Sequence, residues 1–401
     1  MMRSSHATLI ALALPALACS AILGLQEPTV DDTIDGGGDS SGGDVVQGDA
    51  TPDAPIDSPC GADLQTDAHN CGACGRDCLG STCSAGACQP TLVAQSTTIS
   101  PYGLALDNGT LYFTNVHNSD YHSVGKVDAS ATNGTITLLV DYGTGYTTPL
   151  VDGVVWGLAV QNGFFYTAIY AGGGQNGKWE AGVDRCPTTG CTGNTLAVYG
   201  DDSYTIATNA TNVFWGATDT NDSYNVYKAN LDFTGTTSIA TPDSEVNGIV
   251  VDGSNLFFGT FDGVFACTPT CATNAITQGV SDAELLAVDA NNVYYSSTQS
   301  GNPAVLYVPK TGGVPSIIAT DVMLPNGVAV DDNYVYFADI GDTANSTTGK
   351  VARCPKTGCS LGTETTLSVG AAAGDNPREV VLDSQYVYWG TRGGKIWRVA
   401  K

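Results

Sequence analysis

Seven side chains that can bind a polar ligand stand in the same register of a repeated sequence phrase. Each lies five residues before the turn residue of its phrase, and the set is Tyr102, Trp156, Tyr204, Asn247, Glu284, Asn326 and Arg378. If the phrases superpose, these side chains form one ring, with an aromatic side opposite a hydrogen-bonding side. Such a ring suits a sugar or a peptide. The alternative is that the seven side chains only plug a channel and pair locally.

The chain offers few groups for catalysis. Glu284 is the one carboxylic acid of the ring, whereas a glycosidase needs two facing carboxylates. His117 and His122 share a loop, with only Asp120 nearby as a third metal ligand. Acidic turns such as Asp339–Asp342 could hold calcium, but without EF-hand spacing. We therefore predict no catalytic residue, no metal site and no cofactor, with calcium as the alternative.

The phrase consists of a small apolar strand, a turn and an aromatic strand. Its seven turn residues are Asp107, Gln161, Asn209, Asp252, Asp289, Asp331 and Asp383. They lie 37 to 54 residues apart, which is the period of a four-stranded propeller blade. A third strand follows in each repeat, and the seventh repeat stops there, at Lys395–Ala400. We predict that Thr91–Ile99 pairs with that strand and closes an all-β, seven-bladed β-propeller over residues 91–401.

Two other positions of the phrase are predicted to pack. The apolar position next to the ring is expected in the inter-blade core, as Leu104, Leu158, Ile206, Ile249, Leu286, Val328 and Val380. The aromatic strand is expected to pack through Tyr112, Tyr166, Phe214, Phe257, Tyr294, Tyr336 and Tyr388.

The repeats resemble a known class of propellers. PNGVAVDDNYVYFAD at Pro325–Asp339, with GKVARCPKTG after it, is similar to YWTD and NHL repeats, as is VVLDSQYVYWGTRGGKIWRV at the chain's end. The resemblance covers Thr91–Lys401 as a pattern and implies the fold. YWTD propellers usually have six blades and a repeated Tyr-Trp-Thr-Asp, so receptor-type ligands are not implied here.

An enzymatic interpretation competes with binding. Lactonase-type propellers hold a channel metal with carboxylates and Asn, and Glu284, Asn247 and Asn326 resemble that set. Arg378 would oppose the cation. A lactonase-like hydrolase or a lyase that uses Glu284 at the channel mouth is the alternative function.

Charge and the N-terminus indicate export. The net charge of −25 excludes nucleic-acid binding by phosphate neutralisation and favours a soluble monomer. Residues 1–18 are typical of a signal peptide, which ends directly before Cys19. Ala16 and Ala18 before the cut suit ordinary signal peptidase, whereas the Cys directly after it resembles a bacterial lipobox. The lipobox resemblance implies that Cys19 is lipidated, and Ser20 after it favours the outer membrane. Residues 19–59 are acidic, rich in Gly, Ser and Pro, and are predicted to be a disordered linker.

The twelve remaining cysteines form two groups. Residues 60–90 are predicted to be a small disulfide module, because they lack an aliphatic core and contain Cys60, Cys71, Cys74, Cys78, Cys83 and Cys88. A zinc site is the alternative for Cys71 and Cys74. NCGACGRDC in this module resembles the Stig1-type module of surface lipoproteins. Three pairs in the repeats are predicted to staple tight turns: Cys186 with Cys191, Cys267 with Cys271, and Cys354 with Cys359.

These features together predict an exported, outer-membrane lipoprotein that faces the periplasm or the cell surface. Its propeller is expected to act as a noncatalytic binding module for a glycan, peptide or protein ligand, anchored to the membrane by lipid. A structural envelope protein without a dedicated small ligand is a further alternative.

Overall fold

The computed structural model describes residues 59–117, 121–142, 153–171, 182–191, 196–199, 203–219, 221, 223–267, 270–271, 275–277, 282–342, 348–369 and 376–401. The predicted signal peptide, Cys19 and residues 19–58 of the predicted linker lie outside this part. Every regular element in the described residues is a β-strand. Among these residues, no helix has the length and apolarity that a membrane crossing requires.

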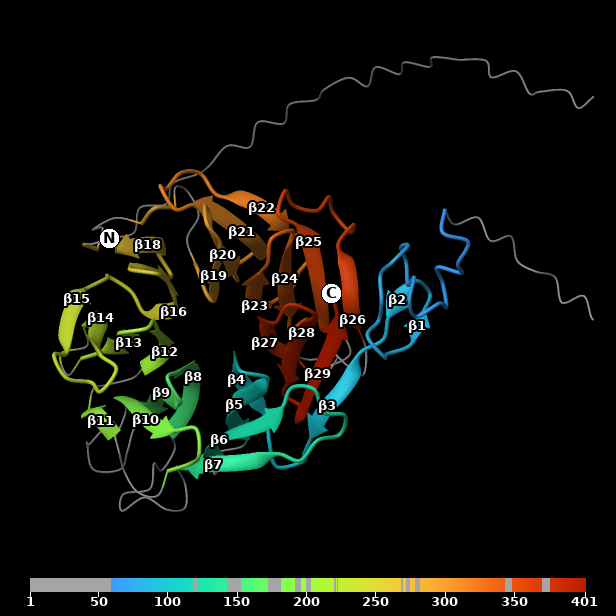
Figure 1. Cartoon of the computed structure of the whole chain (residues 1–401). Helices are drawn as coiled ribbons and strands as arrows, with labels where there is room; N and C mark the ends of the chain where they lie inside the picture. Colours follow the sequence, from blue (N-terminus) through green and yellow to red (C-terminus); the bar gives the residue numbers. More distant parts are fainter. Residues whose placement is uncertain are drawn as a thin grey trace, which may run out of the picture. The chain divides into compact units, whose positions relative to one another are not determined.

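Seven antiparallel sheets stand radially around one axis, as Figure 1 shows, so that each sheet is one blade. The first blade contains β4 (Pro101–Asp107), β5 (Thr110–His117), β6 (Tyr121–Asp128) and β7 (Thr137–Asp141). The second contains β8 (Gly153–Gln161), β9 (Phe164–Ala171), β10 (Gly182–Pro187) and β11 (Leu196–Tyr199). The third contains β12 (Ser203–Thr208), β13 (Asn212–Thr218), β14 (Tyr224–Asn230) and β15 (Thr237–Ala240).

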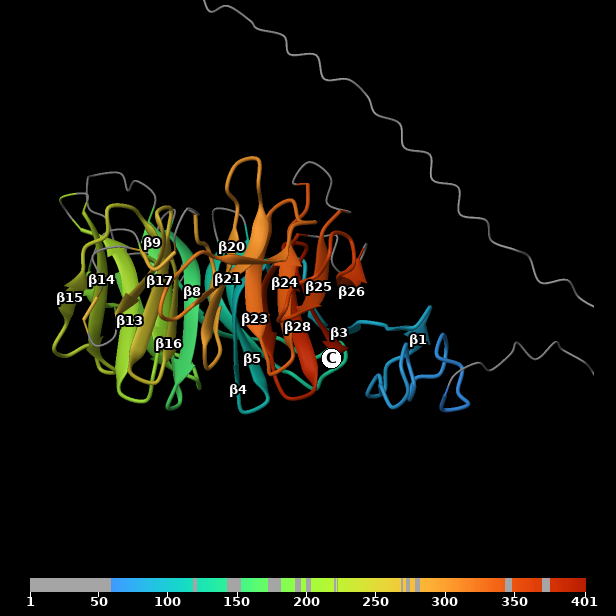
Figure 2. The same ribbon diagram turned by 90° about the horizontal axis from the view of Figure 1, so that it is seen from above.

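The fourth blade has three strands in the described residues, β16 (Val246–Asp252), β17 (Asn255–Thr260) and β18 (Gly263–Cys267). The fifth contains β19 (Leu286–Val288), β20 (Asn292–Ser297), β21 (Ala304–Pro309) and β22 (Ser316–Ala319). The sixth contains β23 (Pro325–Val330), β24 (Tyr334–Asp339), β25 (Lys350–Pro355) and β26 (Thr365–Val369). The seventh contains β27 (Pro377–Leu382), β28 (Tyr386–Thr391), β29 (Lys395–Ala400) and β3 (Thr91–Gln95). Figure 2 shows the same structure turned by 90° from the view of Figure 1.

The predicted ring closure is confirmed. β3 pairs with β29 in antiparallel register, with Ala94 opposite Ile396. The N–H of Ser96 then donates to the carbonyl of Gly394 at 2.9 Å. The strand ends at Gln95, four residues earlier than predicted. The first and last strands of the propeller therefore complete one blade.

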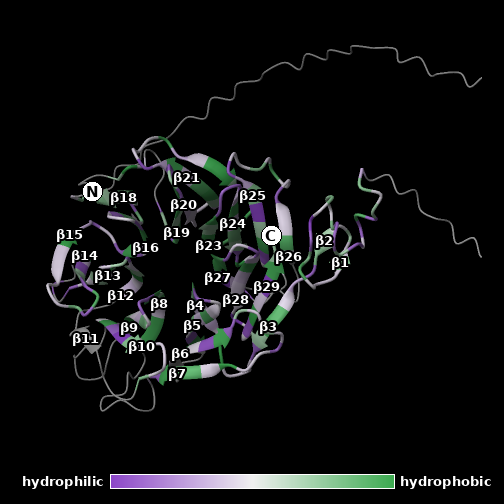
Figure 3. Cartoon of the chain, viewed as in Figure 1, coloured by the Kyte–Doolittle hydropathy of each residue, from purple (hydrophilic) through white to green (hydrophobic). Residues whose placement is uncertain are grey.

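The predicted packing positions are buried, and apolar residues concentrate in the strands of the blades (Figure 3). All seven aromatic positions are at most 5% exposed, from Tyr294 and Tyr336 at 0% to Tyr112 at 5%. Six of the seven apolar positions are buried as well, and Leu286 is half-buried. The positions that recur in the phrase are thus the ones that pack the blades.

The recurring turn aspartate has a structural cause. In the fifth blade, Asp289 Oδ1 accepts the backbone N–H groups of Asn291 and Asn292, each at 2.8 Å. Its Oδ2 accepts the Tyr294 hydroxyl at 2.9 Å and pairs with Lys356 Nζ of the next blade at 2.8 Å. The same aspartate–tyrosine bond recurs in the last two blades, at 2.9 Å and 2.7 Å. The turn therefore ties its own aromatic strand and the neighbouring blade together.

We expect Lys356→Met to make the protein less stable at neutral pH. Burial tends to raise the pKa of Asp289, but its hydrogen bonds, with Lys356 first among them, lower that pKa to about 2. The pair therefore stabilises the fold above pH 4 and is lost as pH falls toward 2. The free energy of unfolding should fall by about 1 kcal/mol at pH 7. Urea unfolding of both proteins checks this, and a difference that persists at pH 2 would contradict it.

The stapled turns in the repeats are confirmed as disulfides between Cys186 and Cys191, Cys267 and Cys271, and Cys354 and Cys359. Two of these turns reach the outermost strand of the preceding blade. The N–H of Cys359 donates to the carbonyl of Ile318 at 2.8 Å, and that of Cys191 to Leu139 at 3.2 Å. The staples thus hold turns that connect neighbouring blades.

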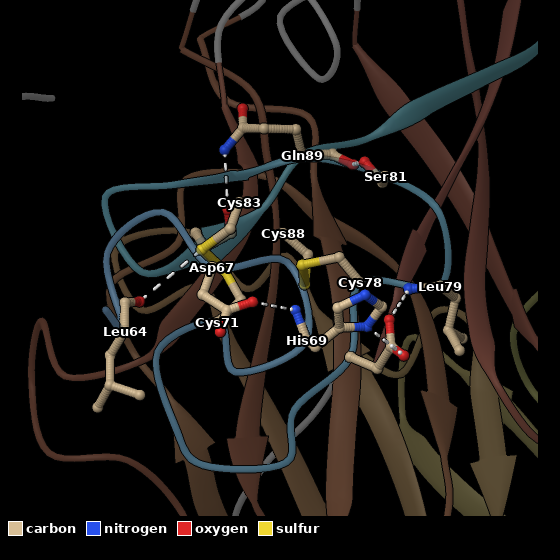
Figure 4. Close-up of a disulfide and its surroundings, with 12 residues drawn as sticks. Leu64, Asp67, His69, Cys71, Cys78, Leu79, Ser81, Cys83, Cys88 and Gln89 are labelled. Atoms are coloured by element: carbon tan, nitrogen blue, oxygen red, sulfur yellow. Dashed lines mark hydrogen bonds and ion pairs between the residues drawn. A yellow bond between two sulfur atoms is a disulfide. The ribbon is translucent and has the colours of Figure 1, made fainter. Parts of the chain in front are cut away.

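The cysteine module also forms three disulfides, which join Cys60 to Cys74, Cys71 to Cys83, and Cys78 to Cys88. Both sulfurs of the proposed zinc pair are therefore in disulfides. The module has two short strands, β1 (Cys83–Ser84) and β2 (Ala87–Cys88), with the polar contacts that Figure 4 shows. The carbonyl of Leu79 in the module accepts a hydrogen bond from the Tyr386 hydroxyl of the seventh blade at 3.2 Å. The module consequently contacts the blade in which the ring closes.

Candidate functional site

The predicted ring residues stand where the innermost strands begin, and six of them line one cavity of about 170 Å³. These six are Tyr102, Trp156, Tyr204, Asn247, Glu284 and Asn326. The seventh, Arg378, does not line the cavity, because its guanidinium carbon lies over the ring of Tyr102, 5.0 Å from the centroid. The structure therefore brings the predicted set to one end of the channel.

Glycines after the ring residues set the distance between neighbouring innermost strands. A Cβ on Gly103 would lie 2.6 Å from the carbonyl oxygen of Trp156, and one on Gly327 would lie 2.6 Å from that of Arg378. A Cβ on Gly157 would lie 3.0 Å from the carbonyl oxygen of Tyr204 in the next blade. Because a side chain here would push the strands apart, these glycines keep the channel mouth narrow.

The aromatic side of the cavity is a cluster of three rings. Tyr102 and Trp156 meet edge to face, with centroids 4.3 Å apart and an interplanar angle of 89°. Trp156 and Tyr204 lie 6.3 Å apart at 50°. Burial raises the pKa of Tyr102 to about 12, so its hydroxyl stays neutral at physiological pH. The rings form apolar walls that meet at an angle.

Three polar atoms of the ring residues are buried without a hydrogen-bond partner among the described residues. They are Trp156 Nε1, Asn247 Nδ2 and Asn326 Oδ1, from three different blades. Buried polar groups in folded proteins are almost always paired, so each such atom requires an explanation. All three atoms belong to residues that line the cavity.

The surroundings of the Glu284 carboxyl group disfavour its charged form. Burial raises its pKa, and the nearby carboxylates of Asp282 and Glu245 raise it further. Thr298 Oγ1 opposes this, since it lies 3.2 Å from Glu284 Oε1; it also lies 2.9 Å from Asp282 Oδ2. Glu284 thus enters the cavity as part of an acidic cluster.

Sequence reasoning missed Glu379, which also lines the cavity. Burial raises its pKa to about 7, although its Oε2 accepts the N–H of Leu104 at 2.6 Å, which lowers it. Four phrases have glycine at this position, so a glutamate there was a detectable departure from the repeat. Glu245 was missed as well; burial raises its pKa, and a hydrogen bond with Tyr204 lowers it.

The remaining candidates lie elsewhere. The side chains of His117 and His122 fall outside the described part. Asp339 accepts backbone N–H groups from Leu324 at 2.8 Å, Met323 at 3.0 Å and Gly341 at 3.1 Å. This carboxylate thus joins the segment before β23 to the segment after β24.

Comparison with known proteins finds solved structures that are similar to this chain. No protein-family model and no curated protein sequence matches the chain. Virginiamycin B lyase from Staphylococcus aureus is similar in structure, with a TM-score of 0.58 and 16% identity over 78% of this chain and 98% of the lyase. The GH74 xyloglucanase from Xanthomonas campestris has a TM-score of 0.57 and 14% identity, over 77% of this chain and 53% of the xyloglucanase. The computationally designed Ika8 protein has a TM-score of 0.49 and 12% identity, over 78% and 100%. At these identities the similarity shows the fold alone, a seven-bladed β-propeller.

Proposed function

We propose that this chain is an exported lipoprotein whose propeller binds a small polar ligand at the channel mouth without catalysis. The observation that carries the proposal is that six ring residues line one cavity, and that three of them, Trp156, Asn247 and Asn326, each have a buried polar atom without a hydrogen-bond partner. Donors, an acceptor and aromatic walls together are the features of a specific binding site.

The size of the cavity limits the ligand. A volume of about 170 Å³ corresponds to about five or six waters at roughly 30 Å³ each. It is smaller than the pockets of about 300–1,000 Å³ that enclose drug-sized ligands. The site therefore suits the end of a longer molecule, such as one sugar unit of a glycan or one terminus of a peptide.

The rest of the chain supports an envelope location. The signal sequence before Cys19 and the acidic linker after it would tether the folded part to the outer membrane by lipid. Six disulfides agree with an oxidising compartment. The net charge of −25 favours a soluble monomer that does not bind nucleic acid.

We expect Trp156→Ala to abolish capture of the ligand on combined glycan and peptide arrays. The substitution removes the central ring of the aromatic cluster and one unpartnered donor. Tyr307→Ala is the matched control, because this half-buried aromatic residue lies on β21, away from the cavity. If both variants bind as the unaltered protein does, the ring is a plug. If the unaltered protein captures no ligand, the result supports the alternative of a structural envelope protein.

One observation favours the enzymatic alternative. Two glutamates with raised pKa values, Glu284 and Glu379, line the same cavity, and a hydrolase or lyase needs such acid–base groups. Turnover on a panel of lactones and glycosides, lost in both Glu284→Gln and Glu379→Gln, would replace the binding proposal.

A further inference from the structure

We propose that the channel mouth selects its ligand by a positively charged ammonium group, such as a peptide N-terminus or a lysine side chain. This inference rests on the proposed binding function and names its ligand class. It follows from the aromatic walls, the surplus of carboxyl groups around the cavity and the position of the nearest arginine.

The aromatic walls are suited to a cation. An ammonium group is attracted to the faces of Trp and Tyr within about 6 Å of the ring centre. Tyr102 and Trp156 meet edge to face at 89°, and Tyr204 adds a third ring 6.3 Å from Trp156. The hydrogen bond between Tyr204 and Glu245 links this ring to an acidic group.

Acidic groups surround the cavity. Glu284 and Glu379 line it directly. Asp282 and Glu245 lie close enough to Glu284 to act on its charge. A ligand ammonium would bring the positive charge that the cavity lining lacks, whereas a neutral sugar would bring none.

The chain's own cations leave the cavity free. Arg378 lies over Tyr102 and does not line the cavity, and Arg392 acts on Arg378. Arg378 thus contacts Tyr102 from outside the cavity lining. The lining itself contains two glutamates and neither Lys nor Arg.

Paired peptide arrays test the inference with the full folded chain. Each peptide is printed with its N-terminus and lysines free, and again with both acetylated. We expect at least tenfold weaker binding to the acetylated spots at pH 7, which corresponds to about 1.4 kcal/mol. Glu284→Gln should reduce this preference at least fivefold. Asp332→Asn is the control, because it removes one exposed carboxylate from the turn at the other end of β23.

The outcomes separate the two proposals. A preference for free amines that falls in Glu284→Gln and persists in Asp332→Asn supports the ammonium site. Equal binding to free and acetylated spots, or binding to neutral glycans alone, overturns it and leaves the binding function intact. An equal preference for free amines in the unaltered protein, Glu284→Gln and Asp332→Asn also overturns it. If the unaltered protein captures neither peptide nor glycan, both proposals fail. Thermal unfolding of Glu284→Gln confirms that the variant is folded.

Discussion

A chain that begins at Pro101 is not expected to form a folded monomer, whereas a chain that begins at Gln89 should form one. The shorter chain lacks β3, so β29 becomes an unpaired edge and the ring stays open. It also loses the buried side chains of Val93 and Ile99. At about 1.5–3 kcal/mol for each buried aliphatic side chain, this alone removes much of a typical stability of 5–15 kcal/mol.

Size-exclusion chromatography and circular dichroism distinguish the two chains. The chain from Gln89 keeps every strand of the propeller but loses the cysteines of the module and the Leu79 carbonyl that Tyr386 contacts, so it should remain a monomer of reduced stability. A point variant tests the same junction in the full chain. Gly394 has a φ of +80°, and a Cβ there would meet the backbone of Ser96 and Ile99, so Gly394→Ala should also destabilise the closure. A stable monomer from the Pro101 chain would show that closure is dispensable.

Much of the fold could be predicted because a propeller is built from local repeats. Each blade contacts its neighbours, so the same apolar, turn and aromatic positions recur, and seven recurrences determine the number of blades. The fourth blade departs from the pattern, since the described residues after β18 form only isolated bridges, such as Thr277 with Gly313. The irregular turn sequence around Cys267 and Cys271 gave no periodic signal for this.

The site was predictable only as far as the repeat extends. The shared register placed Tyr102 and Trp156 at the same mouth, since equivalent positions of a ring must meet at its axis. It could not show that Arg378 lies over Tyr102, because this depends on how a long side chain packs. Nor did it find Glu379, because the equivalent position in four blades is a glycine that contacts backbone. Side chains that break the repeat are therefore the ones that sequence reasoning misses.

We expect Glu379→Gln to raise the free energy of unfolding more at pH 8 than at pH 5. Burial raises the pKa of this carboxyl group from its model-compound value of 4.5 to about 7. A raised pKa means that the folded state favours the protonated form. The stability that this preference gives is complete below pH 4.5 and is lost as pH rises through 7. A shift of this size corresponds to at most about 3 kcal/mol, and to about 2 kcal/mol because the side chain opens into the cavity.

Glutamine cannot ionise, yet its side-chain oxygen still accepts the N–H of Leu104 that Glu379 accepts at 2.6 Å. The variant therefore isolates the cost of the charge from the loss of the hydrogen bond. Urea unfolding at both pH values should show a gain for the variant that grows by about 2 kcal/mol between pH 5 and pH 8. Asp332→Asn, which removes an exposed carboxylate, should show no such growth. A gain for Glu379→Gln that is the same at both pH values would mean that Glu379 titrates as an ordinary glutamate.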